Sequence, residues 1–326
     1  MNILLTGATG FTGTALCRRL AVEGNTVIAF VRYSSDTSAL EQSRVNIKRV
    51  DIKDIDDIRR NFAGIEIVYH LAAAWRAEHS DLREFQRVNV EATRNLLEVA
   101  RENRVNRFVH CSTVGVQGHI DEPPADEKYR YDPGDHYQET KMEGEKLALN
   151  YFSNGLPGVV VRPAGIYGPG DTRFLKLFRL INRRMFVMIG SGETFYHFTY
   201  IDDLVQGFLL AGSRPEAIGE IFTVAGEEYI SLKRLVDLIA DVLERPRPSL
   251  RVPFFPVYKA AVVCDRLCRS FNIEPPLYPR RVDFFRKNRA FSIEKAKRVL
   301  GYRPKTDLKE GIMRTAQWYR ENGYMK

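Results

Sequence analysis

Residues 1–13 read MNILLTGATGFTG and are the strongest indication of the fold in this sequence. A short apolar run at residues 3–5 leads directly into three glycines, and a helical pattern follows them. Gly7 lets the chain turn sharply off a strand, Gly10 lets backbone N–H groups approach a pyrophosphate, and Gly13 lets the helix lie close to the sheet. Because a helix N-terminus also carries positive potential, the order of strand, glycine turn and helix predicts a phosphate cradle.

The first half of the chain alternates short apolar runs with longer amphipathic ones. We expect strands at residues 2–6, 26–31, 45–50, 65–70, 107–111 and 159–162. We expect helices near residues 13–23, 55–62, 82–103 and 137–152. Strands that alternate with helices indicate an α/β fold, namely a Rossmann-type, doubly wound parallel sheet with helices on both faces.

The rhythm changes after Arg162, where prolines and glycines at positions 163–170 break the regular pattern. Later helices are expected at 205–211, 232–243 and 294–300, and a strand at 220–224. We therefore divide the chain into a dinucleotide-binding Rossmann domain, residues 1–162, and a smaller, mainly substrate-binding C-terminal region, residues 163–326. Some elements of that region are expected to return to the sheet.

Composition limits the classes of partner. The 326 residues are 44% hydrophobic and 28% charged, as in an ordinary soluble globule. The net charge of +8 favours anionic ligands, but the basic residues are scattered and no nucleic-acid motif occurs, so we expect no nucleic-acid partner. The four cysteines lack metal-type spacing, which predicts reduced thiols, no metal site and a cytoplasmic location. Since residue 3 already lies in the first strand, we expect no signal peptide.

The most apolar late stretch is residues 252–268. It contains two prolines and several charged residues, so it cannot span a bilayer. It could form the base of a hydrophobic pocket or make peripheral contact with a membrane surface. The alternative is that it packs in the core as an ordinary late helix.

Tyr137 and Lys141 form the pair that carries chemistry. Four-residue spacing on a helix places the phenol and the ammonium on one face. A phenol is nearly all protonated at neutral pH, but a neighbouring ammonium and an oxidised nicotinamide would lower its pKa and make proton exchange practical.

The fifth expected strand ends in Ser112-Thr113, at the sheet edge where doubly wound folds hold ligands. One hydroxyl can bond a substrate oxygen while the tyrosine exchanges its proton. The other is expected to cap the strand end.

Together these motifs resemble the extended short-chain dehydrogenase/reductase family, the NAD-dependent epimerase/dehydratase group. The resemblance covers nearly the whole chain. It rests on the glycine turn, the run His70-Leu-Ala-Ala-Ala74, Ser112-Thr113, Tyr137 with Lys141, and Arg162-Pro163 followed by Tyr167-Gly-Pro-Gly-Asp171.

The resemblance implies a catalytic set and a cofactor site. Tyr137 would be the general acid/base, Lys141 would hold the nicotinamide ribose, and the family's catalytic hydroxyl, five residues before a glycine, would be Thr113. Asp51 and Ile52 resemble an adenine-edge pair, and Asn89 matches an active-site support position. The implied cofactor-binding residues are Gly7, Gly10, Phe11, Thr12, Gly13, Arg32, Asp51, Ile52, Leu71, Ala72, Ala73, Ala74, Asn89, Tyr137, Lys141 and Pro163. By analogy, a homodimer through the helices at 82–103 and 137–152 is expected.

The end of the second strand bears on the choice of cofactor. NAD-preferring enzymes usually place an acidic residue there to accept from the ribose 2′-hydroxyl. This chain has Val31 followed by Arg32, which suits a 2′-phosphate, so NADP is slightly favoured over NAD.

Three functions remain open. The first is hydride transfer to or from a secondary alcohol or ketone of a hydrophobic, steroid- or flavonoid-like substrate, because residues 162–171 resemble the 3β-hydroxysteroid dehydrogenase and dihydroflavonol reductase branches. The second is a nucleotide-sugar 4-epimerase, although Gly165 and Tyr196 stand where that branch usually has an asparagine and a diphosphate-binding arginine; Arg173, Arg280 and Arg281 are possible substitutes. The third is a non-catalytic NAD(P)-binding protein. His70 is expected to be packed, whereas His197 could reach a substrate.

Overall fold

The computed structural model describes residues 1–41, 43–75, 82–271, 273 and 275–325, and only the backbone of Arg269, Arg280 and Arg281. Its centre is a seven-stranded parallel sheet in the order β10–β6–β5–β4–β1–β2–β3. The strands are β1 (Asn2–Thr6), β2 (Thr26–Val31), β3 (Asn46–Arg49), β4 (Ile67–His70), β5 (Arg107–Cys111), β6 (Gly158–Pro163) and β10 (Ile221–Val224). The strand order reverses between β1 and β4, the switch point at which such sheets bind ligands.

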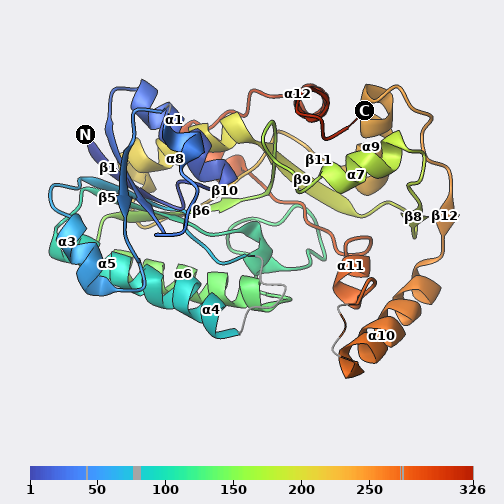
Figure 1. Cartoon of the computed structure of the whole chain (residues 1–326), viewed down its shortest axis with the longest axis horizontal. Coiled ribbons are helices and arrows are strands. Elements are labelled where there is room, and N and C mark those ends of the chain that lie inside the picture. Colours follow the sequence, from blue (N-terminus) through green and yellow to red (C-terminus); the bar gives the residue numbers. More distant parts are fainter. Residues whose placement is uncertain (42, 76–81, 272, 274, 326) are drawn as a thin grey trace.

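Helices cover both faces of the sheet, as expected (Figure 1). On one face lie α1 (Phe11–Val22) and α8 (Ile201–Ser213), and on the other lie α3 (Ile55–Asn61), α5 (Ala92–Glu102) and α6 (His136–Ser153). Successive strand residues point to opposite faces, so Ile3 packs in the core beneath α1 whereas Leu4 packs in the core beneath α5. Burial on both faces explains why these strands read as apolar runs.

The α5–α6 face becomes polar at the carboxyl ends of the strands. Two residues beyond the apolar Leu4, Val68, Phe108 and Val160 stand Thr6, His70, His110 and Arg162, and all four are nearly or wholly buried. The strand alternation therefore delivers a row of buried polar side chains next to the ligand-binding edge.

The helix predicted at 82–103 is confirmed, and it contains a feature that was not predicted. A π-helical turn (Arg87–Glu91) lies between α4 (Leu82–Gln86) and α5. The wider turn buries Asn89, and π turns of this kind occur frequently at functional sites. A short α2 (Ser38–Glu41) and a 3₁₀ turn (Val114–Gln117) complete the first half.

The second half returns to the sheet through α8 and β10 and also builds its own core. Its remaining elements are β7 (Gly165–Tyr167), α7 (Leu175–Asn182), β8 (Met188–Ile189), β9 (Phe195–Tyr200), a 3₁₀ turn (Pro215–Ala217), β11 (Tyr229–Ser231), α9 (Leu232–Val242), β12 (Arg251–Val252), α10 (Phe254–Ser270), α11 (Pro279–Asp283), a π turn (Ala296–Leu300) and α12 (Leu308–Glu321). A small sheet in the order β11–β9–β7 packs with α7, α9 and α12. The division at residue 162 stays a prediction.

Helix α10 projects away from this core (Figure 1). Phe255 is 75% exposed, and Val263 and Leu267 are each 56% exposed, so core packing does not account for the apolar stretch at 252–268. Among the helices of the described residues, none combines the length and the apolar character that a bilayer span requires.

Candidate active site

The glycine turn fits a dinucleotide pyrophosphate. Gly7 has φ +73°, and a Cβ there would lie 2.7 Å from the backbone nitrogen of Ala72. A Cβ on Gly13 would collide with the carbonyl oxygen of Gly7, so neither position accepts a larger residue without a shift. Helix α1 begins at Phe11, and Gly10 caps it without a side chain, which leaves the first amides of the helix without intrahelical partners. The turn thus presents donors and space to an anion.

Asn89 ties the alanine loop to helix α6. Its Oδ1 accepts from the amide of Ala74 at 2.8 Å, and its Nδ2 donates to the Ala74 carbonyl at 3.1 Å and to Thr140 Oγ1 at 3.0 Å. Thr140 directly precedes Lys141. Asn89 therefore fixes the loop of Ala72, Ala73 and Ala74 relative to the Tyr/Lys pair through other residues, as a support position should.

Lys141 is buried and held on the sheet edge. Its Nζ donates to the carbonyl oxygen of Cys111, the last residue of β5, at 2.6 Å. Lys141 as a whole is only 3% exposed. Burial lowers the pKa of Lys141. Two N–H groups of the ammonium remain for a ligand.

The pKa of Tyr137 is raised above its ordinary value, chiefly because the phenol is buried, with Cys111 and Asp135 acting in the same direction. Among the described groups, Arg173 is the cation that lowers it. The lowering that we expected from the neighbouring ammonium is therefore not produced by the protein alone. A lowering of the Tyr137 pKa would then have to come from the positive charge of a bound, oxidised cofactor.

Ser112 and Thr113 differ in their bonding. The Ser112 hydroxyl is buried and donates to Glu145 Oε2 at 2.5 Å. Thr113 Oγ1 accepts from the amide of Gly115 at 3.1 Å, as the N-cap of the 3₁₀ turn, and its own proton stays available for donation. Gly115 in turn lies against Gln138, next to Tyr137, which brings Thr113 near the start of α6.

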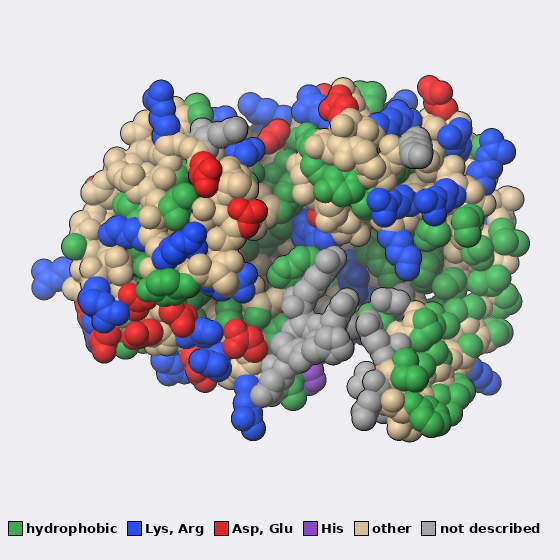
Figure 2. Space-filling view, in the orientation of Figure 1, with side chains coloured by type: hydrophobic (Ala, Val, Ile, Leu, Met, Phe, Trp, Pro, Cys, Tyr) green, Lys and Arg blue, Asp and Glu red, His purple; other side chains and the backbone are tan. Residues whose placement is uncertain are grey.

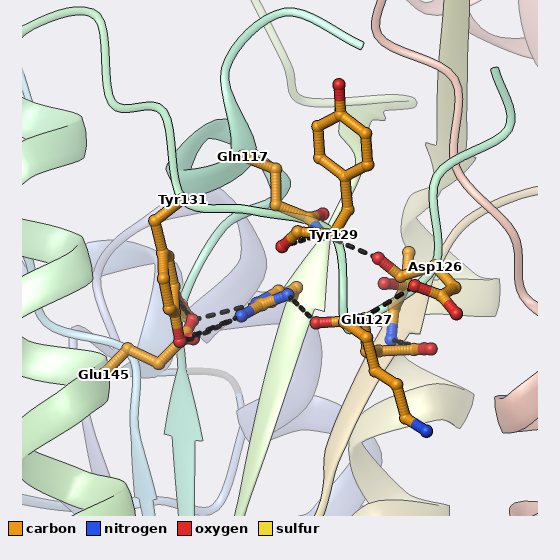
Figure 3. A network of polar contacts seen from close by, with 10 residues as sticks. Gln117, Asp126, Glu127, Tyr129, Tyr131 and Glu145 are labelled. Atoms are coloured by element: carbon orange, nitrogen blue, oxygen red, sulfur yellow. Dashed lines mark hydrogen bonds and ion pairs between the residues drawn. The ribbon is translucent and has the colours of Figure 1, made fainter. Parts of the chain in front are cut away.

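A buried ion pair lies behind these residues (Figure 3). Arg162 donates from Nη2 to Glu145 Oε1 at 2.5 Å and from Nε to Oε2 at 3.0 Å, and both side chains are at most 1% exposed. Tyr131 also donates to Glu145, at 2.8 Å, and the carbonyl oxygen of Glu127 accepts from Arg162 at 3.0 Å. The sequence analysis missed this network, although Glu145 follows Lys141 by four residues and so shares its helix face.

At the adenine end, Arg32 is exposed just beyond β2. Arg49, at the end of β3, donates from Nη1 to the carbonyl oxygens of Tyr33 at 2.7 Å and Arg32 at 3.2 Å. The Arg49 guanidinium therefore braces the backbone of the turn that begins at Arg32, a role that the sequence analysis did not predict. Asp51 and Ile52 follow β3, where Asn95 Nδ2 donates to the Ile52 carbonyl at 3.3 Å.

Arg173 stands at the mouth of the site. Its guanidinium lies 5.6 Å from the ring centre of Phe11 and 5.9 Å from that of Trp75, the residue that follows the alanine run. Its Nε donates to Asp171 Oδ1 at 2.7 Å. In Figure 2 the surface is hollowed between the two halves of the molecule, and basic side chains are visible inside the hollow.

Other predicted residues are placed less directly. Pro163 ends β6 beside Val224 of β10. His70 is packed as expected, between the hydroxyls of Thr6 and Thr93. His197 is buried with both ring nitrogens bonded to the carbonyls of Phe291 and Gly226, so the structure does not favour a substrate contact for it. The side chains of Arg280 and Arg281 lie outside the described residues.

Two observations concern other kinds of site. A cavity of about 620 Å³, lined by charged residues such as Glu127, Glu220 and Lys295, does not include Tyr137 or Thr113, and we do not assign it to the chemistry. In the part of the chain that the structure describes, no group of three or more His, Cys, Asp or Glu side chains could hold a metal ion.

Comparison with known proteins agrees with this geometry. The sequence profile of the NAD dependent epimerase/dehydratase family matches residues 3–225. Sterol demethylase protein B of Methylococcus capsulatus is 30% identical, covering 99% of both chains. The 2-alkyl-3-oxoalkanoate reductase of Stenotrophomonas maltophilia is 30% identical, covering 96% of this chain and 98% of its own length. The mouse protein named sterol-4-alpha-carboxylate 3-dehydrogenase, decarboxylating, is 29% identical, covering 95% of this chain and 89% of its own length.

Two solved structures share the whole fold. The crystal structure of gox2253 has a TM-score of 0.85 at 29% identity, covering 99% of both chains. UDP-glucuronic acid 4-epimerase from Bacillus cereus, solved in complex with NAD, has a TM-score of 0.76 at 25% identity, again covering 99% of both.

The protein is therefore an NAD(P)-dependent oxidoreductase of the extended short-chain dehydrogenase/reductase type. The chain belongs to the NAD dependent epimerase/dehydratase family, which confirms the resemblance seen in its sequence.

Proposed function

We propose that the enzyme interconverts a secondary alcohol and a ketone on a hydrophobic, steroid- or flavonoid-like substrate, with Thr113, Tyr137 and Lys141 as its catalytic residues. The placement of Lys141 carries the proposal, because helix α6 presents it one turn after Tyr137 and the Cys111 carbonyl holds it at the strand end that leads to Thr113. The names of the sterol-directed relatives support the hydrophobic class of substrate.

Each catalytic residue has a defined task. When bound, the nicotinamide supplies the hydride acceptor or donor. Thr113 donates its hydroxyl proton in a hydrogen bond to the substrate oxygen. The phenol oxygen of Tyr137 accepts the substrate's hydroxyl proton during oxidation and returns it during reduction. Lys141 uses its two remaining N–H groups to hold the ribose, and the charge of the oxidised nicotinamide, when it is bound, favours the ionised phenol.

Removal of one phenol oxygen tests the assignment. Tyr137→Phe should lower kcat at least about 100-fold and leave the cofactor Kd unchanged, whereas Lys141→Ala should impair both. Tyr324→Phe, at an exposed tyrosine near the C-terminus, is the control. Hydroxysteroids, flavonoid ketones and UDP- and dTDP-sugars should be compared by nicotinamide absorbance and by product analysis. Retention of most activity in Tyr137→Phe would contradict the proposal.

A nucleotide-sugar 4-epimerase is the second candidate, supported by the likeness to the Bacillus cereus enzyme. Tyr196 speaks against it. That side chain occupies the place where this branch usually has an arginine, and its hydroxyl already donates to the Phe284 carbonyl. Product analysis would reveal an epimerised sugar without net absorbance change. Tight cofactor binding without turnover of any substrate would favour a non-catalytic protein.

We propose NADP as the preferred cofactor. Arg32 is exposed beside the expected ribose position, and Arg49 braces the same turn, so two cations can face a 2′-phosphate. The acidic residue typical of NAD enzymes is replaced by Val31.

Helix α10 is proposed to contact an anionic membrane surface. Hydrophobic side chains gather on the surface over α10 (Figure 2, lower right). The helix exposes the apolar residues Phe255, Val263 and Leu267, and it also exposes Lys259 and Arg266. The double variant Phe255→Ser/Leu267→Ser should no longer sediment with anionic vesicles, whereas Met313→Ser, at an exposed residue of α12, should do so normally. Equal sedimentation of both variants would exclude this role of α10.

A homodimer through α4–α5 and α6, and a cytoplasmic location, complete the proposal. Light scattering at several concentrations tests the first. The second is supported by four cysteines that are all free thiols, and cell fractionation tests it.

A further inference from the structure

Arg173 is a candidate ligand-binding residue that the catalytic assignment does not use. It lies in the loop between β7 and α7, and this loop packs on the glycine turn, because a Cβ on Gly170 would lie 3.4 Å from the Phe11 ring. The guanidinium is placed between the rings of Phe11 and Trp75. Its charge also opposes the rise that burial causes in the pKa of Tyr137, which is consistent with a position in the same crevice.

The guanidinium is oriented but not fully used. Asp171 Oδ1 accepts from Nε at 2.7 Å and the Ile166 carbonyl accepts from Nη2 at 3.1 Å. Asp171 is itself 3% exposed, and its carbonyl accepts from Tyr319 at 2.6 Å, so the clamp is anchored in the core. A guanidinium has five N–H donors. Three of them, including both on Nη1, find no partner in the described part of the chain, and the side chain is 31% exposed.

This arrangement suits one carboxylate in an apolar setting. The free donors lie at the end of the fork, the geometry that pairs with both oxygens of a carboxylate. The rings of Phe11 and Trp75 add apolar surface next to the guanidinium. A diphosphate would need more donors than one partly occupied guanidinium, and the Tyr196 hydroxyl, engaged with Phe284, offers none.

We infer that Arg173 binds a carboxylate on the substrate, near the carbinol that Tyr137 serves, so that the substrate class is a hydrophobic 3-hydroxy or 3-oxo carboxylic acid. This inference rests on the proposed function. Two relatives, the 2-alkyl-3-oxoalkanoate reductase and the sterol-4-alpha-carboxylate 3-dehydrogenase, are named for substrates that carry both groups.

The test compares an acid with its neutral ester. With 3-hydroxydodecanoic acid, Arg173→Gln should raise KM about 10- to 100-fold with the cofactor Kd little changed. A change in kcat, from the loss of a charge near Tyr137, should be the same for the acid and its ester. With the methyl ester, the same variant should change KM less than about threefold, because the ester has no carboxylate charge that could pair with Arg173. For Arg173→Lys, the KM for the acid should lie between the values for wild type and Arg173→Gln, because lysine keeps the positive charge but lacks the paired donors of a guanidinium. Arg289→Gln, whose guanidinium lies over Tyr196, is the control and should leave both substrates unaffected.

A second variant guards against misfolding. Arg173→Gln leaves the buried Asp171 without its cation, so Asp171→Asn/Arg173→Gln should show the same discrimination with normal thermal stability. Equal effects on acid and ester, a wild-type enzyme that does not prefer the acid, or a selective loss of cofactor or UDP affinity would overturn the inference.

Calorimetry with dodecanoate on the cofactor-loaded enzyme separates this inference from the proposed function. Dodecanoate binding that depends on Arg173, without oxidation of any alcohol, would support a carboxylate site at Arg173 and defeat the proposed function, and with it the substrate class. Oxidation of alcohols with equal responses to acid and ester would do the reverse.

Discussion

The Ser112 hydroxyl donates to Glu145 Oε2 over 2.5 Å, and this bond separates the roles of two adjacent hydroxyls. Ser112 is committed to a buried carboxylate, whereas Thr113 keeps its proton for a ligand. Sequence alone left both residues as candidates, with the family spacing pointing to Thr113.

Variants at the two positions should therefore fail in different ways. Thr113→Val should lower kcat/KM about 100-fold with little change in thermal stability, because it removes a donor to the reacting oxygen. Ser112→Ala should lower the free energy of unfolding by about 1–3 kcal/mol and leave kcat/KM within a few-fold. Steady-state kinetics and urea unfolding of both variants give the comparison. The reverse pattern would assign the catalytic hydroxyl to Ser112.

The Glu145–Arg162 pair should matter far more than a surface ion pair. Glu145→Gln leaves a guanidinium that is 1% exposed without its counterion, so the free energy of unfolding should fall by about 3–5 kcal/mol. Glu145→Gln/Arg162→Met should recover part of that loss, since no buried charge remains. Glu102→Gln, which breaks the exposed pair with Arg59, should cost at most about 1 kcal/mol. Similar losses in the two single variants would show that Arg162 is solvated.

The sheet could be predicted from the sequence because its strands are buried on both faces. All six strands expected in the first half are present, and β10 was expected from residues 220–224. The polar residues at the strand ends were harder to interpret. His110 and Arg162 are polar residues near strand ends, and the sequence analysis made no prediction about their burial; parallel pairing and α6 bury both.

Two features of the site had no usable local signal. The π turn around Asn89 depends on the close approach of Gly144, where a Cβ would lie 2.5 Å from the Asn89 carbonyl oxygen, and this contact joins distant parts of the chain. The short strands β7, β9 and β11 are held by each other rather than by long apolar runs. Glu145 did have a signal, since it extends the spacing of Tyr137 and Lys141 by one more helical turn.

Cofactor preference should depend on Arg32. Arg32→Ala should raise the Kd for NADP about tenfold and change the Kd for NAD little, because a charge-assisted bond to the 2′-phosphate is lost. Arg49→Ala should weaken NADP binding as well, because the 32–35 turn loses its brace. Fluorescence titration of both cofactors measures this, with Arg94→Ala on the exposed side of α5 as control. A wild-type protein that clearly prefers NAD would contradict the assignment.

His110 and His70 should contribute differently to stability although they share one environment. Their ring centres lie 5.5 Å apart, and both side chains are buried. His70 bonds Thr6 and Thr93 through its two ring nitrogens, whereas neither ring nitrogen of His110 has a partner among the described residues. Burial lowers the pKa of His70 from 6.5 to about 3, and burial together with Lys141 lowers the pKa of His110 well below 6.5.

Both rings are therefore neutral in the folded protein and take up a proton on unfolding below about pH 6.5. Each should make the free energy of unfolding fall as the pH drops, by up to about 1.4 kcal/mol per pH unit. At pH near 8, His110→Leu should leave stability unchanged or higher, whereas His70→Leu should cost about 1–3 kcal/mol because two hydroxyls lose their partner. Either substitution should remove about one proton from the pH dependence. Urea unfolding between about pH 5 and pH 8 measures both quantities, and a large loss in His110→Leu at the upper pH would show that the buried ring nitrogens are hydrogen-bonded after all.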